Sequence, residues 1–141
     1  MKLIDILKES LNLKAGNIYP DITLTPSPTD MGGKTYEIKN KDKEEIGAVV
    51  IKDIDGIENI IYSIFILPEY RGKHYALPVY VNLAKMLGSI CSGEYREDGT
   101  PTSFVSEDAD KIWKRLKEIY PIEKIKIQGN KFRYCLNSKK L

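Results

Sequence analysis

The sequence has little of what would place it quickly in a functional class. Its 141 residues include two cysteines, one histidine and one tryptophan, and 22 Lys and Arg against 20 Asp and Glu give a net charge of +2. Two cysteines 44 residues apart, with no CxxC and a single histidine, argue against a closed zinc site. So small a net charge gives no global basic field, so nucleic-acid binding would need a local patch.

Long hydrophobic runs are also missing. The longest, Ile60–Leu67, is interrupted by Tyr62 and Ser63 and falls far short of the roughly 20 residues that span a bilayer. The first residues lack the apolar segment of a signal peptide. We therefore expect a cytoplasmic protein without a membrane segment, in which Cys91 and Cys135 are buried free thiols rather than a disulfide.

The pattern of apolar residues predicts a single domain over residues 1–141. Predicted helices cover Lys2–Leu13, roughly Tyr75–Leu87, and a segment that Ser106 caps and Pro121 ends. Predicted strands cover Ile18–Leu24, Thr35–Lys39, Ile46–Asp53, Asn59–Leu67, Ser89–Ser92, Ile122–Ile127 and Lys131–Leu136, with a polar loop over Gly93–Val105. This order predicts an α/β (α+β) fold, with a mixed, mostly antiparallel central sheet flanked by helices.

One segment suggests chemistry. The apolar strand that ends at Leu67 runs into Pro-Glu-Tyr-Arg-Gly-Lys-His-Tyr-Ala (residues 68–76), a short basic turn that opens onto a helix. Unpaired N–H groups at a helix start bind phosphate well, and Arg71 and Lys73 add positive charge there. The segment predicts an anion site, although an ordinary tight turn with two solvated cations explains the same residues.

This segment, within residues 59–88, resembles the signature of the GNAT superfamily of N-acyltransferases, in which Arg or Gln is followed by two residues, Gly, one residue, and Gly or Ala. Arg71 matches the first position and Ala76 the last. The resemblance implies a GNAT fold that binds acetyl-CoA. It implies pantetheine contacts from Ile66 and Leu67 and phosphate contacts from the amides of Arg71, Gly72, Lys73, His74, Tyr75 and Ala76. The short strand that ends at Ser92, the acidic loop after it and the helix that carries Trp113 also resemble small acetyltransferase-like proteins of bacteriophages.

Two positions depart from the family pattern. His74 stands where the central glycine is usual. Its imidazole obstructs the cofactor, lies at the surface where a helical backbone tolerates it, or donates to a phosphate oxygen. Trp113 stands where many relatives carry the tyrosine that protonates the departing thiolate. Because an indole cannot act as that acid, we expect Trp113 to belong to the core.

The resemblance implies transfer of acetyl from acetyl-CoA to an amine, which needs a donor to the carbonyl oxygen, a base and an acid. A backbone N–H near Leu67 is the expected donor, and a water relayed by Tyr62 or Ser63 is a conceivable base. For the acid, Ser92 is the first candidate. Tyr120 and Tyr95 follow, and each of the three side chains also has an ordinary structural explanation.

Acidic residues gather around the predicted acceptor side, and an acidic mouth would favour a cationic amine such as a lysine or polyamine. They are Glu94, Glu97, Asp98, Glu107, Asp108 and Asp110. Some of them also complement a helix dipole.

Two other functions stay open. One is a GNAT-like protein that no longer uses acetyl-CoA and serves in binding or assembly. The other is a nucleic-acid module in which Phe132 and Tyr134 of the terminal hairpin stack on bases. These two residues share one face of a strand, so a face packed on the core explains them equally well. No metal is expected.

Overall fold

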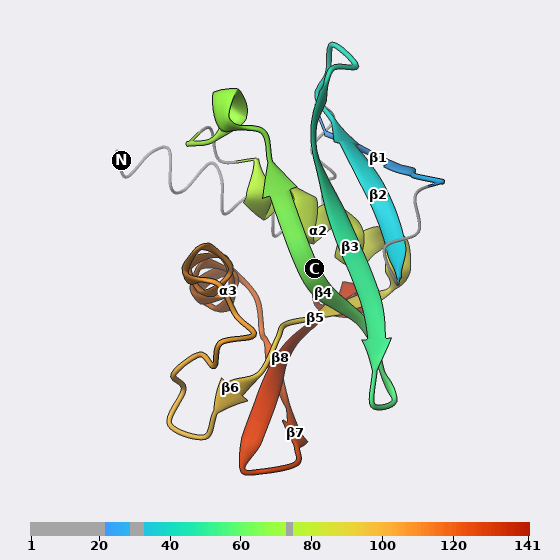
Figure 1. Cartoon of the computed structure of the whole chain (residues 1–141). Coiled ribbons are helices and arrows are strands. Elements are labelled where there is room, and N and C mark those ends of the chain that lie inside the picture. The colour runs from blue at the N-terminus through green and yellow to red at the C-terminus, as the bar shows by residue number, and fades with distance from the viewer. Residues whose placement is uncertain (1–21, 29–32, 73–74) are drawn as a thin grey trace.

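The computed structural model describes residues 22–28, 33–72 and 75–141 (Figure 1). The predicted helix over Lys2–Leu13 lies outside them. The strands are β1 (Thr23–Pro26), β2 (Lys34–Lys39), β3 (Glu45–Ile54), β4 (Ile57–Ile66), β5 (Ser89–Cys91), β6 (Tyr95–Arg96), β7 (Glu123–Ile127) and β8 (Lys131–Asn137). The helices are α2 (Ala76–Leu87) and α3 (Glu107–Ile119), with short 3-10 turns at Pro68–Tyr70 and Ser138–Lys140.

The eight strands form one sheet in the order β1-β2-β3-β4-β5-β8-β6, with β7 on the other side of β8. Neighbours are antiparallel except β4 and β5, which are parallel. The predicted mixed, mostly antiparallel sheet is therefore confirmed. The prediction of an unbroken loop over Gly93–Val105 is wrong, because Tyr95 and Arg96 pair with Phe132 and Lys131 of β8.

Strand β4 is irregular on one side and open on the other. Against β3, Ile51 pairs with Ile61 and Val50 with Ser63, so Tyr62 is an additional residue in a bulge. On the opposite edge, the described residues pair β4 with β5 only at Ile60 and Cys91. Beyond Ile60, the edge of β4 therefore separates from β5, as a bulge beside a splayed sheet allows.

The two helices share one core with the sheet. Trp113 of α3 is 1% exposed, and its ring lies 5.8 Å from that of Tyr80 in α2 and 6.3 Å from that of Tyr134 in β8. The expected core position of Trp113 is confirmed. The predicted cap is confirmed as well, because the Ser106 hydroxyl accepts a hydrogen bond from the Ala109 N–H at 3.1 Å.

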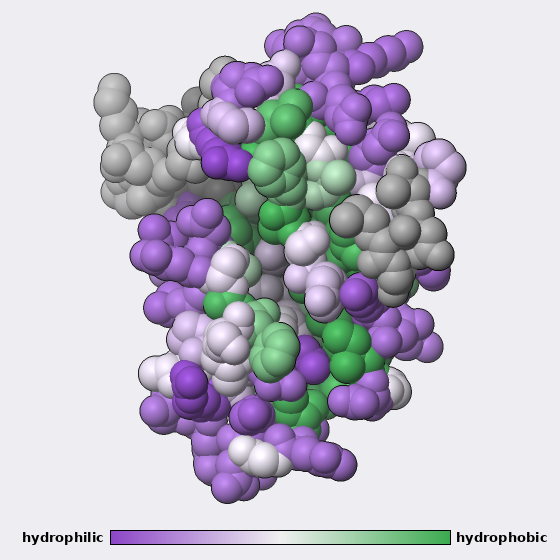
Figure 2. Space-filling model, in the orientation of Figure 1, coloured by the Kyte–Doolittle hydropathy of each residue, from purple (hydrophilic) through white to green (hydrophobic). Residues whose placement is uncertain are grey.

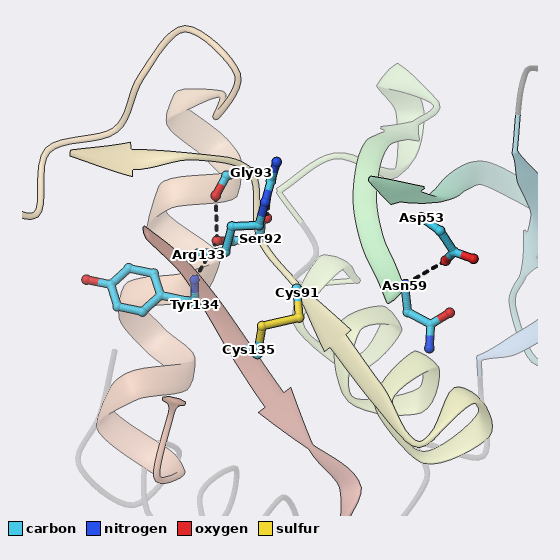
Figure 3. Close-up of a disulfide and its surroundings, with 8 residues drawn as sticks. All are labelled: Asp53, Asn59, Cys91, Ser92, Gly93, Arg133, Tyr134 and Cys135. Atoms are coloured by element: carbon cyan, nitrogen blue, oxygen red, sulfur yellow. Dashed lines mark hydrogen bonds between the residues drawn. A yellow bond between two sulfur atoms is a disulfide. The ribbon is translucent and has the colours of Figure 1, made fainter. Parts of the chain in front are cut away.

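The expectation of free thiols is wrong, since Cys91 and Cys135 form a disulfide (Figure 3). The two residues face each other across β5 and β8, with their Cα atoms 4.1 Å apart. They pack with Ile60 in a small apolar cluster. A separation of 44 residues in the sequence gives no sign of this direct pairing between adjacent strands.

Candidate functional site

The turn between β4 and α2 is held by hydrogen bonds to β3, from the Arg71 side chain and within its own backbone. The Leu67 N–H donates to the Ile46 carbonyl at 2.8 Å, and the Arg71 Nε donates to the Ile66 carbonyl at 2.8 Å. The Arg71 amide bonds to the Pro68 carbonyl at 3.2 Å. Both amides were expected to face a cofactor, but the Leu67 amide is engaged by β3 and the Arg71 amide by the turn itself.

The rest of the predicted phosphate segment remains open where it is described. Gly72 has a φ of +76°, and a Cβ at that position would meet nothing within 4 Å. Tyr75 precedes Ala76, the first residue of α2, and no side chain caps this helix. The first amides of a helix have no intrahelical partner and lie at its positive end. Lys73 and His74 lie outside the described residues.

A cavity of about 170 Å³ lies between the open edge of β4 and the two helices. Ile61, Tyr62, Ser63 and Ile64 of β4 form one wall. The other walls are formed by Tyr80 of α2, by Ala109 and Trp113 of α3, and by Gly93 and residues 104–106 of the connecting segment. The bulge in β4 thus borders the cavity directly.

Tyr80 is the titratable side chain that the sequence reasoning missed here. It is 1% exposed, lines the cavity and contacts Trp113 edge to face. Burial raises the pKa of its hydroxyl well above the ordinary value. The group therefore keeps its proton at neutral pH. What the sequence offered was a tyrosine one turn into α2, the helix that follows the segment resembling the GNAT signature.

The three predicted acids line neither this cavity nor the larger one described next. The Ser92 hydroxyl donates to the Gly93 carbonyl at 2.8 Å and accepts from the Tyr134 N–H at 2.9 Å (Figure 3). The Tyr95 hydroxyl donates to Asp110 at 2.8 Å, and burial first and this bond second raise the pKa of Tyr95. Tyr120 is buried at the end of α3.

A larger cavity of about 520 Å³ lies between the first half of β4 and the segment from β6 to α3. Its apolar walls are Ile54, Ile60, Ile61, Tyr62 and Phe104. Its polar walls include Glu94, Ser103, Ser106 and Arg133. A second irregularity in the β3–β4 pairing precedes Ile60, where Asn59 has a φ of +59° and its N–H donates to Asp53 at 3.0 Å (Figure 3).

Arg133 and Glu94 form a loose ion pair at this cavity. Arg133 is 4% exposed, its Nη1 donates to the Ser92 carbonyl at 3.1 Å, and its Nη2 is 3.8 Å from Glu94 Oε1. Burial lowers the pKa of Arg133, and the Glu94 and Asp55 carboxylates oppose that shift. Lys131 lies 3.6 Å from Glu94 Oε2. Neither of these carboxylate distances is short enough for a hydrogen bond.

The predicted acidic mouth is largely occupied by the chain's own partners. Besides Glu94, the Asp98 carboxylate accepts from the Thr100 side chain and amide, which lowers the pKa of Asp98. Glu107 and Asp110 pair with lysines one turn further along α3. This arrangement gives little support to a concentration of free negative charge that would select a cation.

Phe132 and Tyr134, proposed as stacking platforms for bases, are each 5% exposed and pack against Tyr95. Stacking on bases is therefore wrong for these two residues, and the alternative, a face packed on the core, is confirmed. Figure 2 shows apolar residues gathered along the middle of one face and hydrophilic ones around its periphery. Exposed aromatic residues include Tyr62, Phe65 and Phe104.

Within the described ranges, no helix is long and apolar enough to cross a membrane. The same part of the chain holds no cluster of three or more His, Cys, Asp or Glu residues suited to a metal ion.

The structure is similar to solved GNAT acetyltransferases at low sequence identity. A GNAT family acetyltransferase from Elizabethkingia anophelis with acetyl-CoA bound gives a TM-score of 0.46 at 12% identity, over 83% of this chain and 98% of that chain. Spermidine/spermine N-acetyltransferase from Vibrio cholerae in complex with manganese ions gives 0.47 at 17%, over 99% and 77%. A dodecameric spermidine N-acetyltransferase from the same organism gives 0.47 at 16%, over 99% and 91%.

No protein-family model matches the sequence, and no curated protein matches it. None of the structures named above is a bacteriophage protein, so that origin stays an expectation. The function is therefore argued from the residues of this chain.

Proposed function

We propose that this protein is an acetyl-CoA-dependent N-acetyltransferase that acts on an amine. The observation that carries the proposal is the open edge of β4. It begins beyond Ile60, contains the bulge at Tyr62, borders the cavity of about 170 Å³ and ends at the turn into α2. An extended strand edge can pair with the amides of a pantetheine arm, which itself resembles a strand.

The described part of the turn fits the phosphates of the cofactor. The space beside Gly72 is open, and the uncapped start of α2 at Ala76 presents amides at the positive end of its dipole. Because the amides of Leu67 and Arg71 are already hydrogen-bonded within the protein, we assign the phosphate contacts to Gly72 and the residues that follow it. Lys73 and His74 complete the proposed phosphate segment.

Acetyl-CoA supplies an activated thioester: a C–N bond forms to the acceptor amine, the C–S bond breaks, the amine loses a proton and the sulfur gains one. The bulge in β4 leaves a backbone group unmatched by β3 and can orient the thioester carbonyl. We assign the sulfur's proton to Tyr80 rather than to Ser92, because Tyr80 lines the cavity while the Ser92 proton is engaged by Gly93. Trp113 packs edge to face against Tyr80 and lines the same cavity.

Calorimetric titration with acetyl-CoA and with free CoA tests the binding step. We expect micromolar affinity that is lost when Ala76 is replaced by Trp at the start of α2. Met86→Trp is the matched control, since Met86 is exposed near the other end of the same helix. No binding at millimolar ligand would refute the enzyme and favour the alternative, a GNAT-like binding or assembly protein.

Turnover tests the assignment of the acid. Tyr80→Phe should lower kcat by about a hundredfold or more, the usual contribution of a general acid, while acetyl-CoA affinity stays unchanged. Tyr36→Phe, a change to another buried tyrosine in β2, is the control. An unchanged kcat in the Tyr80 variant would contradict the assignment, and a loss of affinity in the same variant would indicate a structural role instead.

A further inference from the structure

Arg133 is a buried cation whose hydrogen-bonding groups are largely unused. Its Nη1 bonds to the Ser92 carbonyl, but its Nε has no hydrogen-bond partner and its Nη2 is 3.8 Å from Glu94. A guanidinium carries five N–H donors. Burying such a group without acceptors costs free energy, so an arrangement of this kind suits a group that accepts hydrogen bonds from outside the chain.

The Glu94 carboxylate also lacks a full set of hydrogen bonds. Its Oε2 is buried and has no hydrogen-bond partner, and the nearest cation, Lys131 Nζ, is 3.6 Å away. The same cavity is therefore lined by a cation and an anion that pair only loosely with each other, and each keeps an atom without a hydrogen-bond partner. A ligand with both a carboxylate and an ammonium can separate this pair and give each group a closer partner, whereas a ligand with one charge can do so for only one of them.

The remaining walls define the body of the ligand. Ile54, Ile60 and Ile61 form an apolar side, and Tyr62 and Phe104 add aromatic rings that are 56% and 72% exposed. The volume of about 520 Å³ lies within the range of small-molecule sites. Such walls fit an aliphatic or aromatic side chain of modest size.

We propose that this cavity binds an amino carboxylic acid with an apolar side chain. The carboxylate accepts hydrogen bonds from Arg133, the ammonium donates to Glu94, and the side chain packs against Ile60, Tyr62 and Phe104. Both cavities are bounded by Ile61, Tyr62 and Gly93, so a molecule held here lies beside the proposed acetyl site. Its role as acetyl acceptor rests on the proposed function, whereas its binding does not.

Ligands that differ in one charge test the site on the unaltered protein without acetyl-CoA. We would titrate L-phenylalanine, phenethylamine, which lacks the carboxylate, and 3-phenylpropionate, which lacks the amine, with L-leucine as the aliphatic counterpart. We expect phenylalanine to bind about tenfold or more tightly than either single-charge analogue. The proposal would be overturned if phenethylamine bound as tightly as phenylalanine or more tightly. It would also be overturned if neither phenylalanine nor leucine bound.

Two variants assign the charges. Arg133→Met should weaken the binding of phenylalanine and 3-phenylpropionate about tenfold and leave that of phenethylamine unchanged. Glu94→Gln should weaken the binding of phenylalanine and phenethylamine and leave that of 3-phenylpropionate unchanged. Lys126→Met removes an exposed cation of β7 that lines neither cavity and is the matched control. A folded Arg133→Met protein with undiminished phenylalanine affinity would refute the assignment.

A third variant covers the case in which the Arg133 change prevents folding. Phe104→Ala alters an exposed position and should weaken phenylalanine severalfold; an unchanged affinity would overturn the proposed packing. Acetyl-CoA binding without amino acid binding would refute this inference alone. Amino acid binding without acetyl-CoA binding would refute the proposed function alone.

Discussion

The disulfide between Cys91 and Cys135 should make a large contribution to stability. It closes a loop across 44 residues that contains β6, α3 and β7. The chain-entropy expression for a loop of this length gives about 4 kcal/mol of stabilisation through restriction of the unfolded chain. Domains of ordinary stability unfold with about 5–15 kcal/mol, so replacement of both cysteines by alanine should remove a substantial share.

Urea unfolding followed by the fluorescence of Trp113, which is buried in the folded state, measures this contribution. With an m-value typical of small proteins, about 4 kcal/mol corresponds to a midpoint lower by roughly 2 M urea. The wild type in a reducing agent should unfold like the double alanine variant. The reasoning fails if oxidised wild type, reduced wild type and variant share one midpoint.

Three further changes test the local structure. Ser106→Ala should cost about 1 kcal/mol because it removes the cap of α3, which a thermal melt would show as a lower Tm; an unchanged Tm would argue against the cap. Gly93→Ala places a Cβ 2.5 Å from a backbone carbonyl oxygen, so it should destabilise the protein in urea and distort both cavities. Gly99→Ala, which meets no atom within 4 Å but has a φ of +91°, should cost only about 1 kcal/mol, and similar losses at both glycines would contradict the steric account. Burial and the bond to Asp110 raise the pKa of Tyr95, so its contribution is complete below pH 10 and is lost as the pH rises above that value; Tyr95→Phe should make stability between pH 9 and 11 less steep, and parallel pH curves would refute the linkage.

The sequence was sufficient for the order of elements because local patterns determine them. The Asp55-Gly56 turn joins β3 to β4 as expected, with positive φ at both residues. Ser106 begins α3 as predicted, since a side-chain oxygen and the free amides of the first turn lie within a few residues of each other. Such features need no knowledge of distant contacts.

Distant pairing was not predictable from the same patterns. The short strand at Tyr95 is defined by β8, a strand more than 30 residues later, and its two residues are too few to show an alternating pattern. The pairing of Cys91 with Cys135 likewise depends on the register between β5 and β8. A single-residue slip of that register would separate the two sulfurs.

The candidate site was likewise predictable where its residues are close in sequence and not where they are distant. The turn into α2 was found because its residues are contiguous, whereas Arg133 and Glu94 come from segments that only the folded sheet brings together. In the sequence, Arg133 is one of several lysines and arginines between Lys124 and Lys140. Its burial at 4% exposure is what distinguishes it from solvated cations.

The position of β8 has a consequence for the time at which the cavity forms. β8 pairs with β5, β6 and β7, and all three precede it in the chain. The pairings of β5 and β6 with β8 join residues more than 30 positions apart, and such distant contacts form more slowly than a local hairpin such as β7–β8. Because Arg133 lies on β8, the cavity is complete only once these distant pairings have formed, and a ligand that binds there stabilises the paired sheet over states in which β8 is unpaired.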